Sequence, residues 1–286
     1  MTIKELLAFV NKSISTIYDS DEAGQIASWL LEERLNKSRI QLLTQAEEHV
    51  DESLINQIKN DTEALLSFKP IQQILGFTYF YESKILVNEH TLIARPETEE
   101  LVDLIINNNK TKTLLKILDI GTGSGCIPIS LKKHFKDAQV VALDISTDAL
   151  SIAKKSAILN NVQIEFVEAD ILSDKSSLSI TDFDIIVSNP PYIKLDEKEQ
   201  MKNNVLLHEP HLALFVYDED ALLFYRKIID FAIKNNTKSF QIYFEINEEL
   251  GKDVIELLTQ KGFEESTIHK DLQGKDRMVS ASYLIH

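Results

Sequence analysis

The sequence predicts an α/β protein in which a mostly parallel β-sheet is preceded by a small helical bundle and a β-hairpin. Three observations support this fold class. Apolar residues recur at helical spacing from Met1 to about Leu75. The pattern becomes strand-like over residues 77–93. From Leu115 onward, short apolar runs alternate with helical stretches, which is typical of a parallel sheet covered on both faces.

The first part of the chain contains four amphipathic helical segments. Asp21 is placed to cap the second of them, with Glu22 in its first turn. None of the residues in these segments looks catalytic, so we expect a bundle that helps to hold a partner. The apolar positions of the four segments are Ile3, Leu6, Leu7 and Val10; Ala23, Ile26, Ala27, Leu30 and Leu31; Leu42, Leu43 and Ala46; and Leu54, Ile55, Ile58, Ala64 and Leu65.

A β-hairpin is expected over residues 77–93, with its turn at Ser83-Lys84. The aromatic cluster around Phe80 and Tyr81 is expected to pack against the rest of the protein, and lining a ligand pocket is the alternative. The later strands are expected at Lys116–Ile120, Val140–Leu143, Ile164–Val167, Phe183–Val187 and Phe240–Ile246, followed by an antiparallel closing hairpin of Phe263–Lys270 and Met278–Leu284.

Composition and charge exclude several classes of protein. The chain has 286 residues, of which 44% are hydrophobic, so it can bury a sizeable core. Cys126 is the single cysteine, which excludes an internal disulfide and a cysteine-rich zinc site and fits a reducing compartment. The histidines are scattered, and we expect no metal.

The formal net charge of −15 argues against a chain that binds nucleic acid through its phosphates. No run approaches the roughly 18 apolar residues that span a membrane. The start of the chain lacks the features of a signal peptide. We therefore expect a cytoplasmic protein that acts without a membrane and without direct nucleic-acid binding.

A glycine loop follows the first strand of the expected sheet. Asp119 and Ile120 lead directly into Gly121-Thr122-Gly123-Ser124-Gly125, and a helical pattern begins at Ile127. Glycines in this place let the backbone turn sharply and approach a nucleotide-type ligand without Cβ clashes. The spacing Gly-x-Gly-x-Gly matches a diphosphate cradle less well, and Asp119 would repel a diphosphate but tolerate a sulfonium with an ammonium group.

Two acids at later strand ends extend this interpretation. Asp144 ends the second strand 23 residues after Gly121, close to the ~20 expected for an acid that accepts both hydroxyls of a ribose. Asp170 follows the third strand, where an acid can bind the adenine amino group while Ile171 packs on the ring. These features alone do not separate a nicotinamide dinucleotide from S-adenosylmethionine, because both contain adenosine.

The fourth strand ends in the tetrapeptide Asn189-Pro190-Pro191-Tyr192. Two consecutive prolines stiffen the backbone and remove two donors. The Asn189 side chain and the Pro190 carbonyl are then fixed acceptors for an NH2 group on a planar carbon, such as an amide or an exocyclic base amine. Tyr192 offers an aromatic face to the same group. Ligands of such sheets bind at this edge.

At these residues the sequence resembles the class I S-adenosylmethionine-dependent methyltransferases, and more closely the release-factor glutamine methyltransferases (the PrmC/HemK family). The resemblance covers nearly the whole chain. It is carried by the tetrapeptide and by Asn36-Lys37-Ser38-Arg39, Gln73-Ile74-Leu75-Gly76, Leu92-Ile93-Ala94-Arg95-Pro96-Glu97-Thr98-Glu99, His208-Glu209-Pro210, Phe244-Glu245-Ile246 and Lys270-Asp271-Leu272-Gln273-Gly274-Lys275-Asp276-Arg277. Ala94, Asn247 and Ile171 depart from residues common in the family.

The resemblance implies a Rossmann-like, seven-stranded class I methyltransferase sheet. It implies three parts: a partner-binding bundle (1–75), a linking hairpin (76–94) and the methyltransferase domain (95–286). The implied catalytic residues are Asn189, Pro190 and Tyr192, and the implied substrate contacts are Asn189, Pro190, Pro191 and Tyr192. The implied contacts to S-adenosyl-L-methionine are Gly121, Thr122, Gly123, Ser124, Gly125, Asp144, Asp170, Ile171 and Asn189.

The implied reaction methylates the side-chain amide of the glutamine in the Gly-Gly-Gln motif of class I peptide chain release factors. It leaves S-adenosyl-L-homocysteine as product, and a monomer is expected. The nearest rival is an adenine-N6 methyltransferase acting on nucleic acid, which the acidic charge disfavours. The intact loop, acid and tetrapeptide disfavour both a nicotinamide-dependent oxidoreductase and a non-catalytic adapter.

Overall fold

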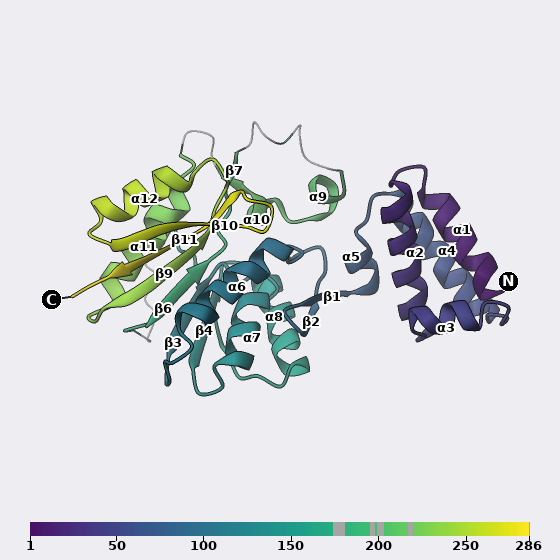
Figure 1. Ribbon diagram of the computed structural model, residues 1–286, viewed down its shortest axis with the longest axis horizontal. Coiled ribbons are helices and arrows are strands. Elements are labelled where there is room, and N and C mark those ends of the chain that lie inside the picture. Colours follow the sequence, from purple (N-terminus) through teal and green to yellow (C-terminus); the bar gives the residue numbers. More distant parts are fainter. Residues whose placement is uncertain (174–180, 195–197, 199–202, 217–219, 286) are drawn as a thin grey trace. The chain divides into compact units, whose positions relative to one another are not determined.

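The computed structural model describes residues 1–173, 181–194, 198, 203–216 and 220–285, and Figure 1 labels most of their helices and strands. The described residues form two compact units. One comprises Met1–Gly76 together with helix α9 (Asn203–His208), and the other comprises the remaining residues from Phe77 onward. In the described part of the chain, no helix combines the length and the apolar character needed to cross a membrane.

The first unit is helical, as its sequence predicts. Its core is built by one face of each long helix; in α1 the buried positions are Ile3, Leu6, Val10 and Ile14, a helical spacing. The cap of the second helix differs from the prediction. The Asp19 carboxylate, not that of Asp21, accepts from the first free backbone amides. The helices are α1 (Ile3–Ile14), α2 (Ser20–Leu35), α3 (Arg39–Thr44), α4 (Glu52–Leu66) and α5 (Ile71–Leu75).

Helix α9 belongs to this unit although it comes late in the sequence. The Gln73 side-chain amide donates a hydrogen bond of 2.8 Å to the His208 carbonyl. The His208 ring nitrogen Nε2 lies 2.9 Å from the Ser67 carbonyl oxygen. These bonds hold the end of α9 at the junction of α4 and α5.

The β-hairpin forms, but it is shorter than predicted and turns elsewhere. Strands β1 (Phe77–Phe80) and β2 (Ser83–Leu86) pair antiparallel. The turn lies at Tyr81 and Glu82, whose φ angles of 42° and 59° are both left-handed, the geometry of a tight hairpin turn. Neither residue is a glycine or asparagine, so the prediction placed the turn two residues too late. Residues 87–95 contain no strand.

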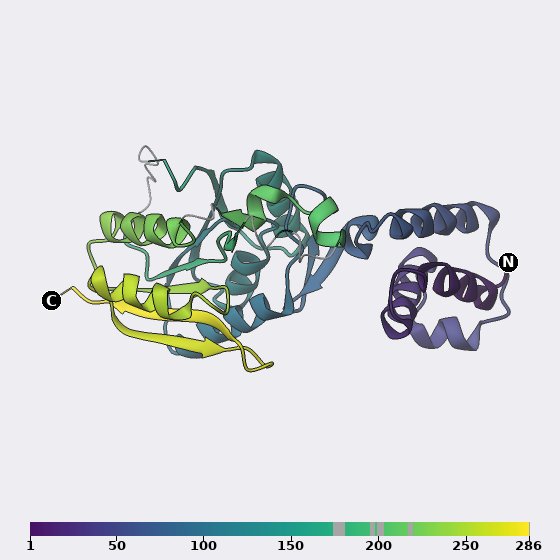
Figure 2. The ribbon, with the colours of Figure 1, turned by 90° about the horizontal axis from the view of Figure 1, so that it is seen from above.

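The second unit contains the expected seven-stranded sheet, in the order β10-β11-β9-β6-β3-β4-β5. Strands β5, β4, β3, β6 and β9 run parallel, while β11 is antiparallel to β9 and to β10. Figure 2 shows the closing hairpin in yellow beside helix α12. The strands are β3 (Lys116–Ile120), β4 (Gln139–Asp144), β5 (Glu165–Glu168), β6 (Ile185–Ser188), β9 (Phe240–Glu245), β10 (Glu264–Lys270) and β11 (Asp276–Tyr283).

Helices cover both faces of this sheet, as buried parallel strands require. On one face α6 (Pro96–Asn108), α7 (Cys126–His134) and α8 (Thr147–Leu159) pack on strand residues such as Ile117. On the other face α11 (Leu223–Asn235) and α12 (Gly251–Gln260) pack on residues such as Leu118. The short elements are α10 (His211–Leu214), β7 (Ile193–Lys194) and β8 (Phe215–Val216). The chain reverses its direction across the sheet between β3 and β6, where ligands of such folds bind.

Candidate functional site

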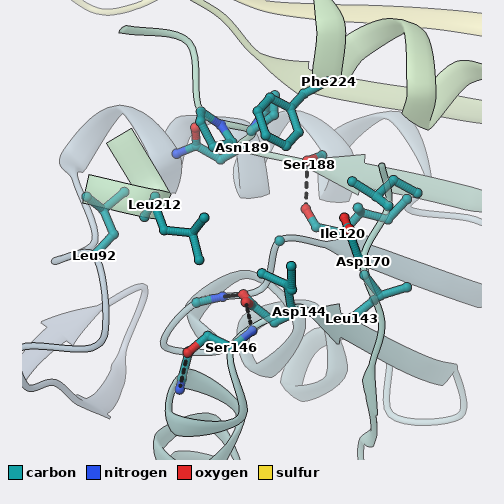
Figure 3. Close-up of a pocket in the computed structure, with 18 of the residues that line it drawn as sticks. Leu92, Ile120, Leu143, Asp144, Ser146, Asp170, Ser188, Asn189, Leu212 and Phe224 are labelled. Atoms are coloured by element: carbon teal, nitrogen blue, oxygen red, sulfur yellow. Dashed lines mark hydrogen bonds between the residues drawn. The ribbon is translucent and has the colours of Figure 1, made fainter. Parts of the chain in front are cut away.

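A cavity of about 340 Å³ opens at the carboxyl ends of the parallel strands in the second unit. Figure 3 draws Asn189 and Phe224 on one side of it and Asp144 on the other. Its size falls within the range of small-molecule sites. It is lined by His90, Leu92, Ile120, Gly121, Gly123, Leu143, Asp144, Ile145, Ser146, Ala149, Ala169, Asp170, Ile171, Leu172, Ser188, Asn189, Pro190, Pro191, Pro210, Leu212, Ala213, Phe224 and Ile228.

The glycine loop forms the floor of this cavity between β3 and α7. Gly121 and Gly123 have φ angles of 75° and 54°, and a Cβ at either position would meet no atom within 4 Å. The space beside them is therefore open to a ligand that approaches the backbone closely. Gly125 has another role: a Cβ there would lie 3.0 Å from the Ala153 side chain, so its glycine lets α7 pack closely against α8.

Asp144 is held in place by two backbone amides. Its Oδ2 accepts from the Gly123 N–H at 2.8 Å, and its Oδ1 accepts from the Ser146 N–H at 2.9 Å. Burial raises the pKa of this carboxyl group. Because each carboxylate oxygen can accept a second hydrogen bond, both oxygens of Asp144 can still accept from the two hydroxyls of a ribose.

Asp119 lies beneath the loop, fully buried at the end of β3. Within the described residues, neither of its carboxylate oxygens has a partner in hydrogen-bonding geometry. Burial raises the pKa of Asp119 to about 7, although the nearby Thr122 hydroxyl acts to lower it. A buried carboxylate without a partner favours a cationic ligand nearby and disfavours a diphosphate.

Three residues of the tetrapeptide, Asn189, Pro190 and Pro191, line the cavity directly after β6. The Ser188 hydroxyl donates a 2.6 Å hydrogen bond to the Ile120 carbonyl, which joins the ends of β6 and β3. Tyr192 is not among the residues that line the cavity, and its contact with a substrate stays a prediction. Its ring packs against the hydrophobic core, and its hydroxyl lies 3.4 Å from Oε1 of Glu245 at the end of β9.

The remaining predicted residues divide into two groups. Asp170 and Ile171 line the cavity, and Asp170 accepts from the Leu172 amide at 2.8 Å. Thr122 and Ser124 are buried below the cavity surface. A direct contact of Thr122, Ser124 or Gly125 with a ligand therefore stays a prediction.

One wall of the cavity lies away from the loop and the tetrapeptide. It is formed by side chains before α6 and after α9, among them Leu92 and Leu212. An ion pair joins these two segments: the Arg95 guanidinium lies 2.6 Å from the Glu209 carboxylate, whose side chain is 1% exposed. Glu209 also accepts from the Ile93 N–H at 3.2 Å. Arg95 thus connects two segments of the wall.

Both parts of the chain match known protein families. Residues 86–214 match the family described as "Methyltransferase small domain", and residues 5–76 match the family described as "PrmC N-terminal domain". A release factor glutamine methyltransferase of Flavobacterium psychrophilum is 46% identical, covering 99% of this chain and all of that protein. One of Bacteroides thetaiotaomicron is 37% identical, covering 98% of this chain and all of that protein.

Solved structures show the same fold. A methyltransferase from Pyrococcus furiosus superposes with a TM-score of 0.52 at 16% sequence identity, covering 79% of this chain and all of that chain. At this identity the likeness concerns the fold alone, and it confirms the Rossmann-like methyltransferase architecture.

Proposed function

This chain belongs to the family of release factor glutamine methyltransferases, and we propose that it transfers the methyl group of S-adenosylmethionine to the glutamine side-chain nitrogen in the Gly-Gly-Gln motif of class I peptide chain release factors. The observation that carries this proposal is the cavity that Asn189 and Asp144 share. It combines an adenosine-type loop with two fixed acceptors for a planar NH2 group. The second product is S-adenosylhomocysteine.

The residues around the cavity fit S-adenosylmethionine. Asp144 accepts from the ribose hydroxyls, and Asp170 and Ile171 contact the adenine. Asp119 provides negative charge near a cationic ligand. The loop residues Gly121 to Gly125 and Asn189 complete the contacts. When bound, the cofactor supplies an electrophilic methyl carbon on a sulfonium.

The tetrapeptide holds the substrate amide. The Asn189 side chain and the Pro190 carbonyl accept one hydrogen each from the glutamine NH2, and Pro191 restricts the plane of the amide. Tyr192, whose ring packs against the core, holds the end of the tetrapeptide in place beside the substrate. An amide nitrogen is a poor nucleophile because its lone pair is delocalised, so alignment is the main contribution. Effective-molarity effects supply up to ~7–11 kcal/mol. The nitrogen loses its proton after methylation has made it acidic, so no strong base is required before attack.

Acceptors at the NH2 group also stabilise the positive charge that develops during attack. This contribution is specific to the transition state, so it raises kcat more than it tightens substrate binding. Asn189→Ala should therefore cost about 2–4 kcal/mol in transition-state stabilisation, by analogy with the loss of one preorganised polar group.

We also propose that the three parts of the chain have different functions. The bundle of residues 1–75 holds the release factor, residues 76–94 link the two parts, and residues 95–286 carry out methyl transfer. The enzyme acts as a monomer in the cytoplasm and needs no metal. Activity that survives a chelator, and elution at the mass of one chain in size-exclusion chromatography, are the expected results.

The test of this function is transfer of a labelled methyl group from S-adenosylmethionine to purified release factor. We expect labelling of the wild-type factor and none of a factor whose motif glutamine is replaced by alanine. Asn189→Ala should label the factor slowly, while its affinity for the cofactor falls much less than its rate of transfer. Labelling of DNA or RNA in place of the release factor would overturn the proposal in favour of an adenine methyltransferase.

A further inference from the structure

A chain of hydrogen bonds connects Asn189 to a buried carboxylate on a different strand. The Asn189 Nδ2 group lies 3.4 Å from Thr98 Oγ1, on helix α6. The Thr98 hydroxyl in turn lies 2.7 Å from Oε2 of Glu245, at the end of β9. Thr98 is 3% exposed and Glu245 is 1% exposed, so water does not compete for these bonds. The three residues lie at the same edge of the sheet because β9 pairs in parallel with β6.

The direction of these bonds follows from the chemistry of the three groups. An ionised carboxylate only accepts hydrogen bonds, and a threonine hydroxyl has one hydrogen to donate. The short contact to Glu245 uses that hydrogen. Thr98 can therefore only accept from Asn189, which places the NH2 of the Asn189 amide toward Thr98.

The carboxylate of Glu245 accepts hydrogen bonds at both of its oxygens. Its second oxygen, Oε1, accepts from the Tyr192 hydroxyl at 3.4 Å, so both polar neighbours donate to it. Burial raises the pKa of Glu245 and the nearby Glu97 charge adds to this, while the hydrogen bonds from Thr98 and Tyr192 and the charge of Arg277 oppose it. Even with a proton on Oε1, the Oε2 atom can only accept from Thr98. Glu245 thus bonds directly to Tyr192 and is linked to Asn189 through Thr98.

We propose that Glu245 is a positioning residue for methyl transfer, which acts through Thr98 to turn the oxygen of the Asn189 amide toward the substrate NH2. This inference rests on the proposed function. Without the carboxylate, the Thr98 hydrogen is released and can be donated to the Asn189 oxygen. The Asn189 amide then turns, and its NH2 group faces the substrate NH2, where two donors repel each other.

Two substitutions interrupt the chain of hydrogen bonds from Glu245 through Thr98 to Asn189. Glu245→Met removes the acceptor at similar volume, and Thr98→Val removes the hydroxyl at similar shape. Only the first also removes the buried charge, whereas the second leaves the Glu245 carboxylate without one of its donors. We expect each to lower kcat for release factor methylation by about 10- to 100-fold, with the dissociation constant of S-adenosylmethionine changed less than threefold in calorimetry. Thr98→Ser keeps the hydroxyl and should retain activity within threefold. Thr62→Val is the matched control, because the buried Thr62 hydroxyl donates to the Ile58 carbonyl within its own helix and, among the described residues, makes no hydrogen bond near the cavity.

A second background tests whether Glu245 acts through Asn189. In Asn189→Ala the amide is already absent, so adding Glu245→Met should change kcat less than twofold. An equal loss in both backgrounds, a parallel loss of cofactor affinity and thermal stability, or wild-type kcat in Glu245→Met would each overturn the inference.

Failure of the proposed function is distinguishable from failure of this inference. If the wild-type enzyme itself labels no release factor, the hydrogen bonds from Glu245 through Thr98 to Asn189 can still be tested by NMR of the Asn189 side-chain NH2. Its signal is assigned as the one that disappears in Asn189→Ala. Exchange of this NH2 with solvent should become faster in Thr98→Val and Glu245→Met. An unchanged exchange rate would overturn the inference whatever the substrate is.

Discussion

Replacement of Asp144 by alanine tests the cofactor site most quantitatively. The carboxylate is held by the amides of Gly123 and Ser146, so its two remaining acceptor positions are fixed before the cofactor binds. Hydrogen bonds to a charged group contribute about 1.5–3 kcal/mol each. Because the carboxylate is only partly buried, we take the lower end of this range, so two such bonds contribute about 3 kcal/mol to the free energy of cofactor binding. That corresponds to roughly 150-fold weaker binding.

Isothermal titration calorimetry of S-adenosylmethionine and S-adenosylhomocysteine measures this loss directly. Asp144→Asn keeps one acceptor oxygen and should weaken binding by about tenfold, near one lost bond. Asp148→Ala is the matched control, since it removes the same charge from the first turn of α8, where the side chain is 67% exposed. If Asp144→Ala bound both ligands within threefold of wild type, the ribose role of Asp144 would be refuted.

Three further predictions concern stability, measured by urea unfolding. Burial raises the pKa of Asp119 to about 7, so between about pH 4 and pH 7 the folded chain holds a proton that the unfolded chain has released, and the free energy of unfolding falls by up to ~1.4 kcal/mol per pH unit. Asp119→Asn should therefore be more stable than wild type at pH 8 and equally stable near pH 4. Parallel pH profiles of the two proteins would contradict this. Arg95→Ala leaves the buried Glu209 carboxylate without its cation and should lower the free energy of unfolding by about 1–3 kcal/mol, less than the ~3–5 kcal/mol of a fully buried pair because Arg95 is partly exposed. Adding Glu209→Gln to this variant should recover part of the loss. An unchanged free energy of unfolding in Arg95→Ala would argue against the ion pair. Gly125→Ala adds a left-handed penalty of about 1–2 kcal/mol to a 3.0 Å contact with Ala153, so a cost below 1 kcal/mol would show that the loop adjusts freely.

Local patterns were sufficient to predict most of the sheet. The five parallel strands were found from short apolar runs, because parallel strands covered on both faces carry apolar residues on both sides. The closing hairpin of β10 and β11 and its antiparallel direction were also correct. The errors are local: Asp19 caps α2 in place of Asp21, and the first hairpin turns at Tyr81-Glu82. Both depend on backbone geometry that neighbouring residue types suggest only weakly.

The pairings within the site that were not predicted join distant segments. Thr98 and Glu245 are 147 positions apart, and Arg95 and Glu209 are 114 apart. No periodicity or short motif links such positions, because their meeting is decided by which strands and helices become neighbours. Asn189 and Asp144 were found because each lies at a strand end, where the parallel topology itself brings residues together.

The most direct test of the account is peptide-level mass spectrometry of a release factor incubated with the enzyme and S-adenosylmethionine. We expect a gain of one methyl group on the glutamine of the Gly-Gly-Gln motif, fragment ions that place it on the side chain, and a strongly reduced yield with Asn189→Ala. A methyl group on any other residue, or an equal yield from Asn189→Ala, would contradict the claim that this tetrapeptide aligns the glutamine amide for transfer.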